Sequence, residues 1–317
     1  MNWPRFIRVA VAVVLTALAF YWSHPSAILS AAANADLRWL LAALGLVLVD
    51  RTLMALRWID LLVALTPGSR PPLSGVLRAF FVSSFVSNFV PSVASDLYRA
   101  YELSRYDVHL AESTASVLMD RALGVLSVAI VAAAALPFAE RLATERGLVL
   151  GLLAIFAICG VAAAVIFSER AAERLRNTVA LLPIPLFRPV TEALTDAVRR
   201  YAAHHRELLR VLVMSIVVQI VRVLQAWCLG LSLGIHIPLT TYFVFIPIIV
   251  LIMQLPITVN GLGTTQVAFL QLFVPQGAPE AKVFALSVLF LALGIAGSLP
   301  GGLFYAIGNA RPTGGRA

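Results

Sequence analysis

Charged residues are scarce in this chain of 317 residues. Asp, Glu, Lys and Arg make up 13% of it, whereas soluble globular proteins carry about 25%. Hydrophobic residues account for 60%, and the mean hydropathy is +0.91. A soluble fold of this length has no means of hiding so much apolar surface. The composition therefore predicts a polytopic membrane protein.

Other absences narrow the class further. Apolar and polar residues do not alternate with a period of two, which favours spanning helices over a β-barrel. The two cysteines, Cys159 and Cys228, lie in separate apolar runs and predict neither a disulfide nor a metal site. No phosphate-binding loop, GxSxG, HExxH or dinucleotide fingerprint occurs. We therefore expect no catalytic residue, no metal, no cofactor and no ATP-driven transport.

The net charge is +8, with 24 Lys and Arg against 16 Asp and Glu. In a soluble protein this excess would suggest a nucleic-acid partner. In a membrane protein it is explained by cytoplasmic arginines that fix topology and contact anionic lipid headgroups. We expect no nucleic-acid partner.

Long apolar runs leave room for seven or eight spanning helices, at about 20 residues each. The N-terminal run follows Arg5 and Arg8 as in a signal peptide, but Tyr21 and Trp22 stand where small residues precede a cleavage site. We therefore interpret it as an uncleaved first span. The predicted spans are residues 6–22, 37–56, 114–136, 147–167, 211–233, 242–257 and 283–307.

The distribution of arginine predicts the topology. Arg5 and Arg8 place the N-terminus in the cytoplasm, and eight arginines place residues 168–210 there too, with an amphipathic surface helix at 191–210. The hairpin 114–136/147–167 then puts 99–113 on the same side. The apolar segment 77–96 starts and ends in the cytoplasm, so we predict a re-entrant pair of half-helices broken near Asn88 and Pro91.

A second broken stretch, QLPITVNGLGTTQ, occupies residues 254–266. Pro256, Gly261 and Gly263 are unfavourable in the middle of a helix. Paired interrupted segments in two halves of a chain indicate a transporter's substrate site, and half-helix N-termini favour an anion there. The alternative is that glycine and proline are simply common in membrane helices.

Ionisable residues inside predicted spans are functional candidates because a charge in a membrane is expensive. They are Asp50 and Arg51, Asp120 and Arg121, Arg222, and the neighbouring pair Asp96 and Arg99. The alternative is that these residues pair across helices and only hold the bundle together. Arg222 has no acidic neighbour in its own helix. It is expected to pair with Asp50, Asp96 or Asp120, or to hold an anionic ligand with its bidentate fork.

Four motifs together resemble a known family. RTLMALRWIDLL (51–62), NFVPSVASDLYRAYELSR (88–105), MDRALGVLS (119–127) and QLPITVNGLGTTQ (254–266) occur in the order expected of it. The sequence is similar to the flippase-like transmembrane family that also forms the membrane half of lysylphosphatidylglycerol synthases. The resemblance extends over nearly the whole chain.

The family's motif residues map onto this sequence with two departures. Ser95 stands where the family usually has glycine, and Gln266 where it usually has glutamate. The second change puts any role of a carboxylate in doubt, although an amide can still hydrogen-bond a headgroup. The positions that match or replace motif residues are Arg57, Trp58, Asn88, Pro91, Ser95, Asp96, Arg99, Asp120, Arg121, Pro256, Gly261, Gly263 and Gln266.

The resemblance implies binding, and translocation between leaflets, of an amphipathic lipid. We interpret the sequence as a whole as that of a protein that binds and moves an anionic or polyprenyl-linked lipid. From their positions, Arg99, Arg121 and Arg222 are expected to attract the headgroup, and half-helix ends near Pro91 and Gly261 to cradle it. Asp96 is expected to orient Arg99 or to release it on protonation. The predicted substrate-binding residues are Asn88, Pro91, Asp96, Arg99, Asp120, Arg121, Arg222, Gly261, Gly263 and Gln266.

The predicted fold class is all-α, a polytopic helix bundle in one transmembrane domain, 1–310, before a tail at 311–317. Its halves are 1–167 and 211–310, and the arginine-rich connection 168–210 joins them. An inverted repeat that relates the two halves is one possible arrangement. The expected location is the bacterial inner membrane. No synthase domain follows the last span, so lysylphosphatidylglycerol synthesis is not expected. The alternatives are a lipid-modifying transferase and an accessory subunit that docks a cytoplasmic enzyme through 168–210.

Overall fold

The computed structural model describes residues 35–66, 72–90, 92–103, 106, 108–135, 157, 160–161, 164–181, 188–254 and 263–307. Every regular element within these ranges is a helix, which confirms the predicted all-α bundle. The helices are α3 (Leu37–Leu65), α4 (Leu73–Val86), α5 (Ser92–Leu103), α6 (Leu110–Ala135), α8 (Glu169–Leu181), α9 (Arg188–Tyr201), α10 (His205–Ser232), α11 (Leu239–Gln254), α12 (Thr264–Phe273), η5 (Val274–Gln276) and α13 (Glu280–Ile307).

Four of the described helices, α3, α6, α10 and α13, are long and apolar enough to cross a membrane. The shortest has 26 residues, which at 1.5 Å per residue gives a length of about 39 Å, more than the bilayer's hydrocarbon core. Large apolar side chains stand exposed on α3, among them Leu41, Leu44 and Leu48. Such a surface suits lipid tails and would be a liability in water. The chain is therefore an integral membrane protein.

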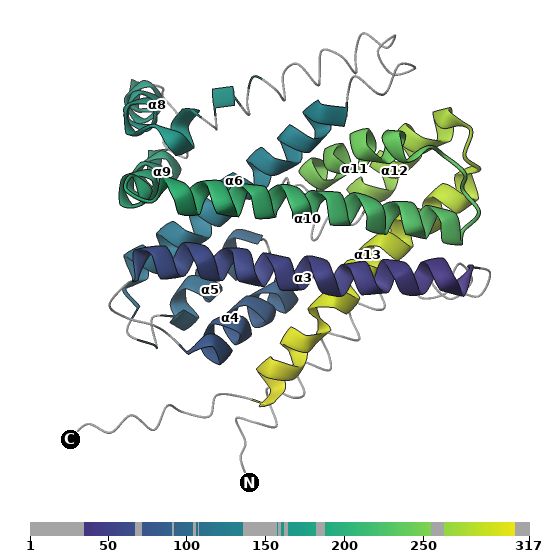
Figure 1. Cartoon of the computed structure of the whole chain (residues 1–317), viewed down its shortest axis with the longest axis horizontal. Coiled ribbons are helices and arrows are strands. Elements are labelled where there is room, and N and C mark those ends of the chain that lie inside the picture. The colour runs from purple at the N-terminus through teal and green to yellow at the C-terminus, as the bar shows by residue number, and fades with distance from the viewer. Residues whose placement is uncertain are drawn as a thin grey trace.

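Helices α3 and α10 form an antiparallel pair through the middle of the molecule (Figure 1). Their ends are tied together at both sides. Asp36 at the start of α3 donates its backbone N–H to the carbonyl of Ser232 at the end of α10, at 2.8 Å. At the other side the buried hydroxyl of Tyr201 donates to the carbonyl of Leu61 at 2.7 Å. Burial raises the pKa of Tyr201, so this donor stays protonated.

Apolar side chains fill three clusters around this pair. The largest joins α10, α11, α12 and α13, where Phe273 stacks on Phe269 and also contacts the rings of Tyr242 and Phe245. A second joins α6, α8, α9 and the start of α10. The third joins α3, α4, α5 and α6 around Trp58. These clusters leave the polar face of α3 between them, where the charged residues lie.

Glycine lets α13 and α4 cross at very close range. A Cβ atom on Gly301 would lie 1.9 Å from the carbonyl oxygen of Phe81 in α4, which is far inside contact distance. A Cβ atom on Gly297, one turn earlier, would lie 2.5 Å from a side-chain carbon of Val47 in α3. Small residues four apart are a common way for membrane helices to approach each other. This crossing fixes where α4 stands relative to the polar face of α3.

The first predicted break separates two described helices. Helix α4 ends at Val86, residues 87–90 form turns, and α5 begins at Ser92, while Pro91 itself lies outside the described residues. At the second predicted break, α11 ends at Gln254 and α12 begins at Thr264, with 255–262 outside the described residues. The spans 6–22 and most of 147–167, and the tail 311–317, lie outside them as well.

The predicted amphipathic helix at 191–210 is wrong in its extent. Helix α9 ends at Tyr201, and a new helix, α10, begins at His205. The chain changes direction here: Figure 1 shows α9 nearly end-on and α10 along its length. Tyr201 is fully buried and bonded to α3, and the N–H of His204 closes a turn on its carbonyl at 2.8 Å. The backbone turn at 201–204 separates α9 from α10 although the sequence pattern continues.

Replacing Gly301 with alanine should destabilise the bundle by about 1–3 kcal/mol, because the added methyl group forces the α4–α13 crossing apart. The free energy of unfolding in detergent micelles measures this effect. Gly45→Ala is the matched control, since a Cβ at Gly45 meets no atom within 4 Å. Equal stability of the two variants would contradict the close crossing.

Candidate functional site

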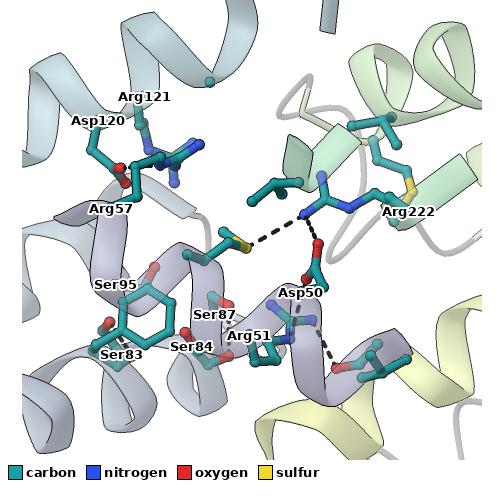
Figure 2. Close-up of a pocket in the computed structure, with 18 of the residues that line it drawn as sticks. Asp50, Arg51, Arg57, Ser83, Ser84, Ser87, Ser95, Asp120, Arg121 and Arg222 are labelled. Atoms are coloured by element: carbon teal, nitrogen blue, oxygen red, sulfur yellow. Dashed lines mark hydrogen bonds and ion pairs between the residues drawn. The ribbon is translucent and has the colours of Figure 1, made fainter. Parts of the chain in front are cut away.

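A cavity of about 320 Å³ lies between α3, α4, α5, α6, α10 and α13, where α11 also contributes Val250 and Met253. Figure 2 shows its charged side chains meeting from different helices. Its volume is at the lower end of the range for small-molecule sites. The charged residues that line it are Asp50, Arg51, Arg57, Asp96, Arg99, Asp120, Arg121 and Arg222.

One face of α3 forms the polar side of this cavity. Val47, Asp50, Arg51, Met54 and Arg57 all line it, at the spacing of three and four residues that places side chains on one helix face. The opposite face of α3 exposes apolar side chains. The helix is therefore amphipathic, with its apolar face towards the lipid and its polar face towards the cavity.

At one side of the cavity, which we call the Arg222 end, three charged residues meet. The Nη2 atom of Arg222 donates to Oδ1 of Asp50 at 3.0 Å, and it lies 3.4 Å from the sulfur of Met54. Arg51 donates from Nη2 to the carbonyl of Gly294 in α13 at 3.0 Å. Its Nε lies 4.0 Å from Asp50, too far for a hydrogen bond. Of the three aspartates that the sequence offers as partners for Arg222, the structure pairs it with Asp50.

At the other side, which we call the Asp120 end, Asp120 bridges two arginines. It accepts from Nε of Arg57 at 2.7 Å and from Nη2 of Arg99 at 3.4 Å, and all three side chains are about 95% buried. Arg57 also donates to Ser215 of α10 at 3.0 Å. Together these bonds connect α3, α5, α6 and α10 at one point.

Two further contacts hold the Arg99 side chain. Its guanidinium lies 4.5 Å from the ring centroid of Trp58, a cation–π arrangement. Asp96, one turn earlier on α5, lies 3.7 Å from Arg99 and also accepts a hydrogen bond from Nε of Arg121. The i,i+3 pair of Asp96 and Arg99 that the sequence predicts is therefore present, and it joins the same network.

The charges in the cavity do not balance. Among the described residues that line it, five are arginines and three are aspartates, an excess of two positive charges. An uncompensated charge away from water is costly, because the surrounding protein and lipid screen it poorly. The arginine fork has five N–H donors, so an arginine bonded to a carboxylate still has donors for a second anion. The cavity is therefore chemically suited to bind anions.

Helix α4 provides an uncharged polar wall. Ser83, Ser84 and Ser87 line the cavity together with Asn88, whose amide donates to the hydroxyl of Ser298 at 2.8 Å. Ser83 and Ser87 each donate their hydroxyl hydrogen to a carbonyl of α4 at 2.8 Å. Within the described residues, no group of three or more His, Cys, Asp or Glu side chains is placed to hold a metal ion.

The structure brings most of the predicted site residues together. Six of them line the cavity: Asn88, Asp96, Arg99, Asp120, Arg121 and Arg222. Gly263 and Gln266 do not line it. Gln266 instead accepts the backbone N–H of Gly263 at 2.7 Å and caps the start of α12. Pro91 and Gly261 lie outside the described residues. Whether any of the ten binds a ligand stays a prediction.

Sequence reasoning left several lining residues out of the predicted site. Asp50 and Arg51 were candidates only as charged residues in a span, and Arg57 only as a motif residue. One signal was available: Asp50 and Arg57 are seven residues apart, so they share a helix face. The serines of α4 carried no comparable signal, because serine is common in membrane helices.

Replacing Asp120 with asparagine should cost about 3–5 kcal/mol of stability, because it leaves Arg57 and Arg99 buried without their shared carboxylate. Asp60→Asn is the control. Asp60 pairs at 3.7 Å with Arg210, whose side chain is 63% exposed, and such surface pairs contribute at most about 1 kcal/mol. Unfolding in detergent measures both values. If the two variants lose similar amounts of stability, Asp120 does not hold the helices together as argued.

The fold and the cavity define a polytopic helical membrane protein with a positively charged internal cavity. Comparison with known families is more specific. Residues 5–301 match the family described as the lysylphosphatidylglycerol synthase TM region, and the chain belongs to this family. A comparison with curated proteins finds no significant match.

Proposed function

We propose that this protein binds the anionic headgroup of a membrane lipid in its charged cavity and carries that lipid from one leaflet to the other. The observation that supports this most is the excess of arginine over aspartate in a cavity between membrane-length helices. The family description, which names the membrane region of a lipid synthase, supports a lipid as the ligand. The bacterial inner membrane is the proposed location, with a cytoplasmic N-terminus.

In this proposal the arginines share their donors between the aspartates and the ligand. Arg222 and Arg121 are each bonded to one aspartate and are 19% and 35% exposed, so both offer remaining donors to the cavity. Arg99 is more deeply buried and is held by Asp96, Asp120 and Trp58. Its charge attracts the headgroup while its position stays fixed. The aspartates keep the arginines stable in the absence of ligand and lower the affinity enough for release.

The helix break beside the cavity supports a re-entrant entrance. Helix α4 has 14 residues and α5 has 12, so each is about 20 Å long or less, too short to cross the hydrocarbon core of the bilayer alone. Asn88 at the break and Ser95, Asp96 and Arg99 after it all line the cavity. We propose that α4 and α5 enter and leave the membrane on the same side and that headgroups pass along this break.

Lipid carried through purification tests the binding step. We expect native mass spectrometry of the full chain in mild detergent to show an enriched anionic lipid. The double variant Arg121→Gln/Arg222→Gln should lose it by at least about tenfold, because charge-assisted hydrogen bonds are removed at both ends of the cavity. The same variant should also lose transport of a fluorescent anionic lipid in vesicles, measured by reductive quenching of the outer leaflet.

Arg206→Gln/Arg210→Gln is the matched control, because both arginines are exposed at the start of α10 and neither lines the cavity. It removes the same charge and should leave binding and transport unchanged. Equal lipid content in the two double variants would overturn the binding site. If the Arg121→Gln/Arg222→Gln variant loses its lipid but the unmodified protein shows no transport in vesicles, the binding site is supported and translocation is rejected.

A further inference from the structure

The excess positive charge of the cavity is divided between its two ends. At the Arg222 end, Arg51 and Arg222 stand against Asp50 alone. At the Asp120 end, Arg57, Arg99 and Arg121 stand against two carboxylates, Asp96 and Asp120. Each end therefore carries one arginine in excess. A ligand that neutralises the cavity needs one negative charge at each end.

The geometry of α3 sets the separation of the two ends. Asp50 belongs to one end and Arg57 to the other, seven residues later in the same helix. A rise of 1.5 Å per residue places their Cα atoms roughly 10 Å apart, and seven residues are close to two full turns, so both face the cavity. Met54 lies between them on this face. Figure 2 shows Arg121 and Arg222 on opposite sides of the cavity. A ligand with two separated phosphates therefore suits both ends better than a single phosphate does.

The serine wall indicates what joins the two charges. The hydroxyls of Ser83 and Ser87 donate to carbonyls of α4, and in this arrangement their oxygens accept further hydrogen bonds. Acceptors suit the hydroxyl groups of an alcohol and repel phosphate oxygens. In Figure 2, Ser84 and Ser87 lie between the Arg57 side and the Asp50 side of the cavity. The polar but uncharged part of a ligand would meet this wall.

We propose that the ligand is a lipid with two phosphate groups joined by a hydroxyl-bearing bridge, one phosphate at each end of the cavity and the bridge against the serines of α4. This inference rests on the proposed function and specifies the headgroup that it leaves open. It distinguishes such a lipid from one with a single phosphate and from one whose two phosphates are directly linked. A glycerol-bridged diphosphate lipid, cardiolipin, is the simplest probe.

The test is a titration of the full chain in detergent with cardiolipin, phosphatidylglycerol and a polyprenyl diphosphate, followed by native mass spectrometry. We expect one cardiolipin per chain, bound at least about tenfold more tightly than either other lipid, because only cardiolipin satisfies both ends. Arg121→Gln and Arg222→Gln should each reduce the affinity for cardiolipin to that for phosphatidylglycerol. Arg210→Gln should change neither.

A charge-restoring variant separates charge from structural damage. Arg222→Gln leaves Asp50 without its 3.0 Å partner, whereas Asp50→Asn/Arg222→Gln removes both charges and leaves Arg51 in excess at that end. We expect this double variant to regain the preference for cardiolipin. Arg121 is 35% exposed and Asp96 keeps Arg99 nearby, so Arg121→Gln tests the other end in a variant that retains its fold.

Three results would overturn the two-phosphate ligand. These are equal affinity for phosphatidylglycerol and cardiolipin, two phosphatidylglycerol molecules bound as tightly as one cardiolipin, or an unchanged preference in both single variants. Each of them leaves the proposed function standing if Arg121→Gln/Arg222→Gln still loses anionic lipid. If that double variant keeps all its lipid, the proposed function fails together with this inference.

Discussion

The buried carboxylate of Asp120 is the interaction on which the rest of the site depends. It accepts hydrogen bonds from Arg57 of α3 and Arg99 of α5, and Arg57 also reaches Ser215 of α10. Two arginines this deeply buried would otherwise repel each other and destabilise the bundle. Because Asp120 holds them, the short helix α5 stays packed beside α3 and α6. The other arginines of the cavity then face a preformed space with surplus positive charge.

Much of the fold could be predicted from composition and helix periodicity. The apolar runs gave the positions of α3, α6, α10, α11 and α13, and the breaks after Val86 and Gln254 followed from proline, glycine and asparagine. Local pattern did not decide where helices end against a tertiary contact. Helix α9 ends at Tyr201, whose hydroxyl is bonded to α3, and no window of sequence around 191–210 reveals this contact. The re-entrant arrangement and the inverted repeat stay predictions.

The site was predictable residue by residue but not as a set of pairs. A charged residue within an apolar run is easily recognised, so the sequence identifies Asp120, Arg121 and Arg222 as candidate site residues. Which helices bring charges together depends on long-range packing, and Arg222 therefore had three open partners in the sequence before Asp50 proved to be its neighbour. Gln266 shows what a motif alone leaves open, and its binding of a ligand stays a prediction. Its motif position suggested a headgroup contact, whereas its side chain caps α12 at Gly263.

The central claim is that the excess arginine charge of the cavity is compensated by a lipid headgroup. An experimental structure of the protein in nanodiscs containing native anionic lipids tests it most directly. We expect density for phosphate beside Arg222 and beside Arg121, with acyl chains leading out between the helices. A cavity filled by the protein's own side chains, or by acyl chains without phosphate, would contradict it.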